Sequence, residues 1–498
     1  MSKPSEQDPL FPRYLSFLSA RYLFRRPSGL AAVLAVTFGV AIILITLSIM
    51  GGYIDELERI IQGQESHIIV TGRERAYDVR NLPEVERAIK AFPNVAATSP
   101  YIETLAMYRS AQFNPCHLRG IVPETEPLVS AVGRYTLRPA ELDLILEKLG
   151  VEEEEKDDAE PSALDRRHEP DAIGFIHEVQ MAPGRAPLSP EEFASLFGTE
   201  KRKEVLQSRN PEVLADLGGR VPPAVVVGIQ LLLGREVFLG QVVTLATIAP
   251  GGHEPVQRKF VITGAFRSGD FDADKQILYA HVDVLKNMLG LASLETGSRY
   301  EGIRVSIKEP SKVQTTRLRI ARALEAEHPQ LTVMPWNRIP RQRNLLRAVE
   351  SEKVLIYFLL IVLMAFTCCM VLLMLLLTVI EKTRDMGVLL ALGATPGGIV
   401  RIFLANGAVL SIAGVGLGLG AGYLFCVFIN PIHDWIYART GWRLFPPEIY
   451  RMDQIPIAFR PQDVLLSIAP PIILGFLASL APAVWASRRD PIKAIHYE

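Results

Sequence analysis

The sequence predicts an α-helical membrane protein: one transmembrane helix, a large extracytoplasmic α+β domain, and three further transmembrane helices. Four stretches contain no charged side chain and are long enough to cross a bilayer, which takes about 20 apolar residues. They are 27–54, 354–380, 402–432 and 464–487. A long polar segment, 55–353, separates the first stretch from the second. Apolar residues make up 49% of the 498-residue chain and the mean hydropathy is +0.20, a combination unusual for a soluble protein of this length.

Charge and cysteine content exclude several other classes of protein. The chain has 53 Lys and Arg against 54 Asp and Glu, a net charge of −1. No overall basic field is available for nucleic acid, and the apolar content is too high for a disordered protein. Four cysteines in so long a chain are too few for a disulfide-rich secreted protein.

The basic residues set the expected orientation, because Lys and Arg collect on the cytoplasmic side of short loops. Five precede residue 27, three lie in 381–401 and three follow residue 487, against four in 433–463. Four spans also place both termini on one side. We therefore expect a cytoplasmic amphipathic segment at 1–26, a cytoplasmic segment at 381–401, a cytoplasmic tail at 488–498, an outer loop at 433–463 and the domain 55–353 outside the cytoplasm.

Two of the spans carry further information. The first is too long for a cleaved signal peptide, and Leu47-Ser48-Ile49-Met50 offers no small-residue cleavage site. The fourth contains Pro470, Pro471 and Pro482, so we expect a kinked or broken helix there, because proline cannot donate the backbone hydrogen bond.

The segment 55–353 combines strand and helix signals. β-rich runs predict strands at 68–71, 225–227, 241–245, 260–262 and 276–279, and apolar residues at helical spacing predict helices at 84–92, 282–289 and 313–328. From about 137 to 220 the composition changes and includes an acidic run at 152–158. We interpret 137–220 as an insertion that is partly ordered at best. The acidic run is then a solvated loop or, alternatively, a site for cations or a basic partner.

Sequence motifs of enzyme active sites are missing. The chain contains no G-x-x-x-x-G-K-[ST] phosphate loop, and the glycine-rich stretch 393–398 lacks the lysine that would reach a phosphate. Neither His168-Glu169 nor His177-Glu178 extends to H-E-x-x-H, and no G-x-S-x-G is present. We therefore predict no enzyme activity, no catalytic residue, no cofactor and no metal site in this chain.

The third span has glycines at every second position from 414 to 422. Gly414, Gly418 and Gly422 give overlapping G-x-x-x-G spacings, which allow two helix backbones to approach closely. A dinucleotide-binding loop has a similar glycine pattern but needs a preceding strand, which is missing here. We predict close helix packing at these residues, with a flexible, register-shifting helix as the alternative.

The segment between the second and third spans is charged at first and then aliphatic. Gly393 suits a helix end, and Thr395 before Pro396 suits a new helix start. Exposed aliphatic side chains just outside a membrane either lie on lipid headgroups or dock into a cytoplasmic partner, and the residues alone leave both open. The candidate coupling residues are Glu381, Lys382, Arg384, Asp385, Met386, Gly387, Leu389, Leu390, Leu392, Gly393, Ala394 and Thr395.

Short motifs along most of the chain point to one family. The first half contains 21–26 (RYLFRR), 47–53 (LSIMGGY), 67–70 (HIIV), 118–121 (LRGI), 227–228 (VG) and 264–269 (GAFRSG) with Asp274. The second half contains 336–337 (WN), 352–353 (EK), 381–394, 482–495 and, in the outer loop, Y-x-x-D-x-[IL]-P at Tyr450, Asp453 and Pro456. These motifs resemble those of the LolC/LolE-type lipoprotein-releasing permeases in the MacB/FtsX/LolC superfamily, whose fold is that of a type VII ABC permease.

The resemblance implies a permease subunit of the bacterial inner membrane, with its large domain in the periplasm. It implies a separate LolD-like cytoplasmic ATPase, which binds ATP and Mg²⁺ and pushes the coupling segment. It further implies a second permease copy or a paralogue, a lipoprotein substrate and, as a further candidate partner, a periplasmic LolA-like carrier. Movement of spans two and three would then drive the outside domain to release lipoproteins from the outer leaflet, a process of mechanotransmission.

A lipoprotein anchor needs apolar shelter, because each CH₂ that leaves lipid for water costs about 0.8 kcal/mol. The resemblance places this shelter between spans one and two of paired subunits. The candidate lining residues are Phe38, Ile42, Ile45 and Ile49 on the first span and Tyr357, Leu360, Met364 and Val371 on the second. The alternative for each is an ordinary lipid-facing or helix-packing role.

Other functions remain open from the sequence. Within the same superfamily the chain could be a MacB-like efflux permease or an FtsX-like regulator of cell-wall hydrolases. A MacB would normally carry its ATPase on the same chain, and an FtsX-like protein would normally have a smaller outside domain. From different classes, it could be a membrane-anchored binding or sensing protein without an ATPase, or a membrane hydrolase.

Overall fold

The computed structural model describes residues 27–73, 77–109, 113–148, 185–217, 220–292, 298–381, 396–442, 445–446, 452 and 454–487. The chain divides into two compact units. The helical unit comprises 1–56, 347–440 and 455–498, and the sheet unit comprises 57–346 and 441–454.

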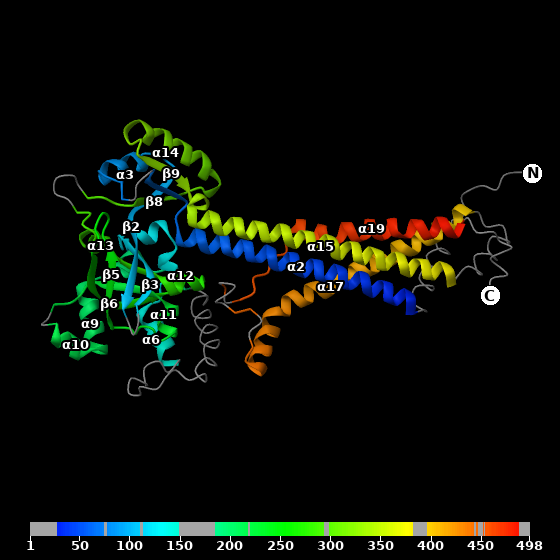
Figure 1. The fold of residues 1–498 in the computed structure, drawn as a ribbon, viewed down its shortest axis with the longest axis horizontal. Helices are drawn as coiled ribbons and strands as arrows, with labels where there is room; N and C mark the ends of the chain where they lie inside the picture. The colour runs from blue at the N-terminus through cyan, green and yellow to red at the C-terminus, as the bar shows by residue number, and fades with distance from the viewer. Residues whose placement is uncertain are drawn as a thin grey trace, which may run out of the picture. The chain divides into compact units, whose positions relative to one another are not determined.

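Long apolar helices dominate the helical unit (Figure 1). They are α2 (Pro27–Gln64), α15 (Pro340–Glu381), α17 (Pro396–Thr440) and α19 (Pro461–Ser487). Within the described residues, these four helices are long and apolar enough to cross a membrane. Three of them extend well beyond the apolar stretches of the sequence, because a helix continues through polar residues as long as its backbone hydrogen bonds are made. Apolar composition therefore located the spans but not the helix ends.

The fourth span is not broken at its prolines. Helix α19 continues through Pro470 and Pro471 without a break in its secondary structure. Proline is tolerated in membrane helices when neighbouring groups satisfy the carbonyl oxygens that it leaves without a donor. The expected break is therefore absent.

Glycines on one face of α17 pack against α2. A Cβ at Gly414 would lie 2.6 Å from Val36 Cβ, and one at Gly418 would lie 2.8 Å from both the Thr37 carbonyl oxygen and Val40 Cβ. Gly422 faces Ala41 and Leu44 of α2 in the same way. These three positions are four residues apart, so they share one face of the helix. Gly416 and Gly420, between them, have no atom within 4 Å of a built Cβ. The close approach of α2 and α17 thus depends on Gly414, Gly418 and Gly422.

The contact between α17 and α19 uses small residues from both helices. Gly407 of α17 faces Ser479 of α19, and Gly475 of α19 faces Ser411 of α17. The hydrophobic effect does not hold helices together inside a bilayer. Such close backbone approach therefore supplies the van der Waals contacts that stabilise a membrane helix bundle.

The strands of the sheet unit form one sheet in the described residues, in the order β3-β7-β4-β6-β5-β2-β8-β1-β9. Their bounds are β1 Ile68–Gly72, β2 Val95–Arg109, β3 Phe113–Ile121, β4 Ala224–Gly228, β5 Val242–Ile248, β6 Pro255–Phe266, β7 Ile277–His281, β8 Gly302–Ile307 and β9 Leu331–Pro335. Strand β2 also pairs with β3, which closes six strands into a ring. The pairs β3–β7 and β4–β6 are parallel, and the other pairs are antiparallel.

Helices cover the sheet and complete its core. They are α3 Leu82–Lys90, α4 Glu126–Val129, α5 Val132–Tyr135, α6 Pro139–Lys148, α8 Pro190–Ser195, α9 Thr199–Arg209, α10 Pro211–Asp216, α11 Ile229–Leu233, α12 Phe271–Gln276, α13 Val282–Met288 and α14 Val313–Glu327, with short 3₁₀ turns η2 Pro310–Lys312 and η3 Trp336–Arg338. Helices α3 and α14 lie side by side near β9 (Figure 1). Ile320 and Leu324 of α14 and Val85 and Ile89 of α3 join the buried core of the sheet.

The predicted strands and helices of this unit agree in position with β1, β4, β5, β6 and β7 and with α3, α13 and α14. The region 137–220 contains more structure than its composition suggests. Its residues 185–217 include α8, α9 and α10, and Phe193, Leu196 and Leu206 are buried. The acidic run 152–158 lies outside the described residues.

Replacing Gly418 by Ala should destabilise the helical unit. The new methyl group would have to displace the Thr37 carbonyl or Val40, and such overpacking costs about 1–3 kcal/mol. Gly420→Ala is the matched control, because its methyl group enters open space. Thermal unfolding of the purified full-length protein in detergent should show a lower melting temperature for Gly418→Ala alone. Equal melting temperatures of the two variants would contradict this packing.

Candidate functional site

Within the helical unit, residues 455–460, directly before α19, contact both α2 and α17. We call this segment the strap. The Asn430 side chain of α17 donates to the Ile455 carbonyl (3.2 Å) and accepts from the Ile455 N–H (3.0 Å), as a neighbouring strand would. The Ala458 N–H then donates to the Ser48 carbonyl of α2 (3.0 Å). A Cβ at Gly52 would lie 2.5 Å from the Pro456 carbonyl carbon and oxygen, so only glycine admits the strap here.

An ion pair fixes the end of this strap. The Arg460 guanidinium pairs with the Asp55 carboxylate of α2 and donates to the Gly51 carbonyl (3.3 Å). Pro456 and the glycines 51–52 belong to the two sequence motifs 450–456 and 47–53, which lie about 400 residues apart in the chain. The fold brings these two motifs into contact, which their sequence positions do not reveal.

Two small cavities occur among the membrane helices. One, of about 10 Å³, is lined by Val36, Gly39, Val40, Ile43, Met364, Thr367, Cys368, Pro471, Leu474 and Gly475. The other, also about 10 Å³, lies beside the strap and is lined by Leu47, Met50, Gly51, Lys353, Ile356, Tyr357, Arg460 and Asp463. Each has room for about one water molecule, so neither holds an acyl chain in a single copy of the chain.

The residues expected to line an anchor pocket are spread over the helix surfaces. Met364 and Tyr357 each line one of the two small cavities. Phe38 and Ile42 are exposed on α2, at 66% and 42% of their surface. Ile45, Ile49 and Leu360 are half-buried, and the Val371 side chain lies outside the described residues. Among the side chains that the structure describes, the single chain therefore does not gather these residues into one pocket.

Most of the expected coupling segment lies outside the described residues. Glu381 is the last residue of α15, and α17 begins at Pro396, directly after Thr395. Residues 382–395 between them are not described, and neither are Tyr450 and Asp453 of the outer-loop motif.

In the sheet unit, two adjacent strands lead directly into membrane helices. Strand β1 starts four residues after α2 ends at Gln64, and α15 starts at Pro340, shortly after β9 ends. The two strands pair antiparallel with Ile68 opposite Pro335. The attachment points of α2 and α15 are therefore neighbours on one ladder of hydrogen bonds.

The last turn of α2 is tied to the surrounding sheet unit. The Ala131 N–H donates to the Gly63 carbonyl (2.8 Å), and the Gln64 side chain donates to Ser268 Oγ (3.1 Å). The Ser66 hydroxyl donates to the Ile68 carbonyl (2.8 Å) and accepts from the Val305 N–H of β8 (3.2 Å). These bonds hold the turn between α2 and β1 from three sides.

A cluster of buried charges lies at this turn. Glu65 Oε1 accepts from Arg119 Nη2 of β3 (2.8 Å), and Glu65 Oε2 lies 3.6 Å from Arg304 Nε of β8. Arg304 Nη1 also pairs with Glu126, and Arg119 Nε lies 2.9 Å from Glu103 of β2. Arg304 is fully buried, and Arg119, Glu126 and Glu65 expose 5% or less of their surface. The two guanidinium groups thus connect the end of α2 to four elements of the sheet unit, β2, β3, β8 and α4.

Burial and charge shift the pKa values of two carboxyl groups beside this cluster. Burial acts to raise the pKa of Glu103, but the Arg119 guanidinium outweighs it and holds this pKa well below its usual range. Burial, with the Glu103 charge, raises the pKa of Glu301 to about 7. Glu301 Oε2 accepts from the Glu103 N–H (2.8 Å). The cluster therefore contains one firmly ionised carboxylate and one that takes up a proton near neutral pH.

Sequence reasoning did not identify this cluster. Arg119 lies in the 118–121 motif, but its partner Glu65 is 54 residues away, and the paired residues Glu126 and Arg304 are 178 residues apart. A signal was present at Ile303-Arg304-Val305, where a charge interrupts an apolar strand. A charged residue in such a position is almost always paired when it is buried.

The pH dependence of stability tests the electrostatics of the cluster. Since the pKa of Glu301 rises from about 4.5 in the unfolded chain to about 7 in the fold, stability from this group is present below pH 4.5 and lost as the pH rises through 7. Glu301→Gln keeps an acceptor for the Glu103 N–H and removes the titration. At pH 8 this variant should be more stable than the wild type by at most about 3 kcal/mol, and at pH 5 by much less. Melting temperatures of the wild type and Glu301→Gln from pH 5 to 8 measure this difference in stability. Parallel pH profiles of the two proteins would contradict the raised pKa of Glu301.

Comparisons with known proteins show what the chain is similar to. The FtsX-like permease C-terminal family matches residues 357–491. The lipoprotein-releasing system transmembrane protein LolC of Xylella fastidiosa (strain 9a5c) is 22% identical over 470 residues, which cover 94% of this chain and 94% of that protein. The corresponding LolE of Haemophilus influenzae is 19% identical over 498 residues, covering 96% of this chain and 98% of that protein.

A third relative matches a much shorter part of the chain. The macrolide export ATP-binding/permease protein MacB of Rhodopirellula baltica is 31% identical over 121 residues, or 24% of this chain and 15% of that protein. The long apolar helices, the FtsX-like C-terminal part and the end-to-end similarity to LolC and LolE lead to one conclusion. The chain is an ABC transporter permease with an FtsX-like C-terminal part, and it is similar to LolC and LolE along almost its whole length.

Proposed function

We propose that this chain is the permease subunit of a lipoprotein-releasing ABC transporter of the bacterial inner membrane. A separate cytoplasmic ATPase drives it through the segment 381–395, and the sheet unit acts from the periplasmic side on lipid-anchored proteins in the outer leaflet. A second permease copy or a paralogue completes the transporter.

The proposed substrate rests on how much of the chain is similar to LolC and LolE. LolC and LolE, which are named for lipoprotein release, match this chain over almost its whole length, sheet unit included. The MacB relatives, which are named for macrolide export, match 24% to 41% of it. The substrate-facing part of a permease is the part that must differ between cargoes, so similarity beyond the membrane helices favours the lipoprotein substrate over efflux.

Helix continuity supports a mechanical coupling. Helix α15 is unbroken from Pro340, just after β9, to Glu381, where the expected coupling segment starts. A continuous α-helix keeps its length because each turn is fixed by backbone hydrogen bonds, so a displacement at one end is passed to the other. At the β9 end, the antiparallel β1–β9 pairing joins α15 to the end of α2, which the Glu65–Arg119 pair holds.

The exposed helix faces support a shelter formed by more than one chain. On α2, Leu30, Leu34, Phe38 and Ile42 follow one another at four-residue spacing and expose 42–66% of their surfaces. In the apolar part of α15 only 6% of the residues are buried. Such surfaces are covered by lipid or by another protein in a membrane. An acyl chain held between these faces in paired permeases would avoid water, whose contact costs about 0.8 kcal/mol per CH₂.

Leu390→Asp should abolish binding of the ATPase. A charge in the aliphatic part of the coupling segment would have to be desolvated in a groove of the partner, and a buried unpaired charge costs several kcal/mol. Leu390→Met, which keeps the apolar side chain, is the control. Co-purification of a tagged stand-alone ABC ATPase with each variant measures the loss. Normal binding and normal ATP-driven release by Leu390→Asp would rule out docking through this residue.

Reconstituted vesicles test both the substrate and the mechanical coupling. Wild-type permease with its ATPase should release a triacylated lipoprotein when ATP is added. Glu65→Gln weakens the attachment of α2, so it should lower the amount released per ATP hydrolysed while hydrolysis continues. The control Glu204→Gln changes an exposed ion pair with Lys201 and should leave this ratio unchanged.

Two results would overturn the proposal in different ways. Failure to release any lipoprotein, together with ATP-driven export of a soluble small molecule, would replace release by efflux. An unchanged ratio of release to hydrolysis in Glu65→Gln would leave the substrate assignment in place and exclude the α2 attachment as part of the coupling. The ratio is independent of how much of each variant is folded.

A further inference from the structure

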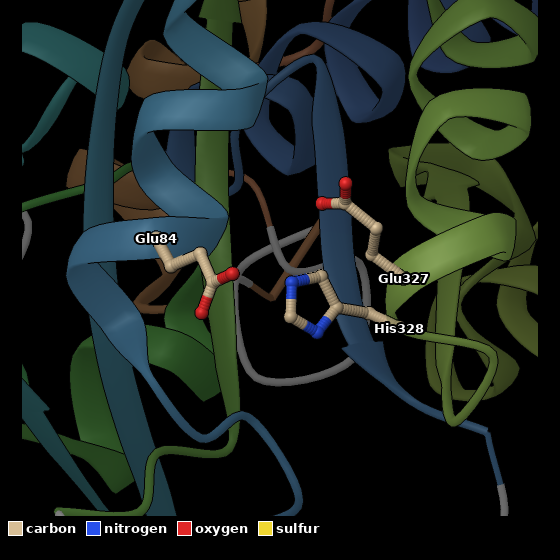
Figure 2. Close-up of side chains that lie close together, drawn as sticks. All are labelled: Glu84, Glu327 and His328. Carbon is tan, nitrogen blue, oxygen red and sulfur yellow. The ribbon is translucent and has the colours of Figure 1, made fainter.

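Three side chains with metal-binding atoms meet on the helices that cover the sheet unit. Glu84 lies in the first turn of α3, and Glu327 and His328 lie at the end of α14. One atom from each, a carboxylate oxygen or a ring nitrogen, lies within 4.8 Å of the other two. Figure 2 shows the Glu84 carboxylate to the left of the His328 ring and the Glu327 carboxylate above it, with a ring nitrogen turned toward Glu84.

His328 lacks the partner that its burial requires. The residue exposes only 7% of its surface, and its Nε2 is buried without a hydrogen-bond partner. A buried polar atom without a partner costs about 1–3 kcal/mol. The backbone holds the residue in place, because the His328 N–H donates to the Leu324 carbonyl (2.7 Å) and the His328 carbonyl accepts from the Leu331 N–H (3.0 Å). The main chain is therefore fixed at this residue, and the buried ring has a nitrogen available for a ligand.

The two carboxylates are also available. Among the described residues, neither Glu84 nor Glu327 forms an ion pair with Lys or Arg. Both are exposed, so their side chains can rotate without disturbing the core. Two carboxylates facing one imidazole repel each other unless a cation lies between them.

We propose that Glu84, Glu327 and His328 form a binding site for a divalent transition metal ion, with Zn²⁺ as the expected ion. Imidazole nitrogen and carboxylate oxygen bind zinc at about 2.0–2.2 Å, with a water molecule as the fourth ligand of a tetrahedral site. Ligand atoms of such a site are about 3.4 Å apart, so the side chains have to close by at most about 1.4 Å. Mg²⁺ and Ca²⁺ prefer all-oxygen sites, and the imidazole therefore favours Zn²⁺ over them.

The position of the site gives the metal a structural consequence. Helix α3 follows β1 in the chain and α14 precedes β9, and these are the two strands that lead to α2 and α15. An ion held by Glu84 and His328 would join α3 to α14 and so cross-link the two helices beside this ladder. This inference does not depend on which substrate the transporter moves.

Zinc titration of the full-length protein tests the site. After EDTA treatment and removal of the chelator, the detergent-solubilised wild type should bind Zn²⁺ in isothermal titration calorimetry with excess Mg²⁺ present. Loss of a residue that only hydrogen-bonds to a metal ligand lowers metal affinity by about 10- to 100-fold. Glu84 and Glu327 are proposed as direct ligands, so Glu84→Gln and Glu327→Gln should each weaken Zn²⁺ binding by at least about 10-fold. Zn²⁺ should also raise the melting temperature of the wild type more than that of these variants.

Two further variants make the result specific. Glu325→Gln removes another exposed carboxylate of α14 and should bind Zn²⁺ as the wild type does. Glu84→His replaces one zinc ligand by another and should retain binding that Glu84→Gln loses. Both glutamate variants leave the buried His328 intact, so a folding defect does not confuse the result. Equal Zn²⁺ affinity in the wild type, Glu84→Gln, Glu327→Gln and Glu325→Gln, or no binding in the wild type, would overturn the proposal.

Discussion

The arrangement of the sheet unit depends on the pairing of buried charges where α2 ends. Arg119 and Arg304 would each be very costly without a carboxylate, and Glu65 and Glu126 supply them. Because Glu65 directly follows α2, the requirement to pair these arginines also fixes the end of a membrane helix. A hydrophobic contact at the same place could slide, whereas short charge-assisted hydrogen bonds have preferred directions. For a protein proposed to transmit movement, a directional attachment is the physically suitable one.

Close backbone approach has a comparable role among the membrane helices. The glycine face of α17 against α2, and Gly52 of α2 against Pro456, leave no room for a side chain. Where the hydrophobic effect cannot hold helices together, such contacts and the hydrogen bonds of the strap supply the cohesion. The exposed apolar faces of α2 and α15 are left for lipid, a second permease or a substrate anchor. The packed and exposed faces of α2 thus suit separate tasks.

The proposed metal site and the charge cluster lie at opposite ends of the β1–β9 ladder: His328 comes shortly before Leu331, which is opposite Gly72, and Glu65 comes shortly before Ile68, which is opposite Pro335. Each joins residues that are distant in the chain, Glu84 with His328 and Glu65 with Arg304. Cross-links between distant segments restrict local opening, because the joined elements then open together or not at all. A sheet unit that resists local opening suits the proposed transmission of movement through α15.

The sequence by itself determined the four apolar spans, the mixed strands and helices between the first two, and the resemblance to the LolC/LolE-type permeases. Apolar length, residue alternation and local motifs are properties of neighbouring residues, so they are readable without a fold. Only the tertiary structure decided which glycines of the run 414–422 contact α2, that motifs 47–53 and 450–456 touch, and that α19 continues through its prolines. It also decided that Arg304 is paired and that His328 lies beside Glu84, because burial and partners at long sequence separation follow from strand order and helix packing, which no local pattern encodes.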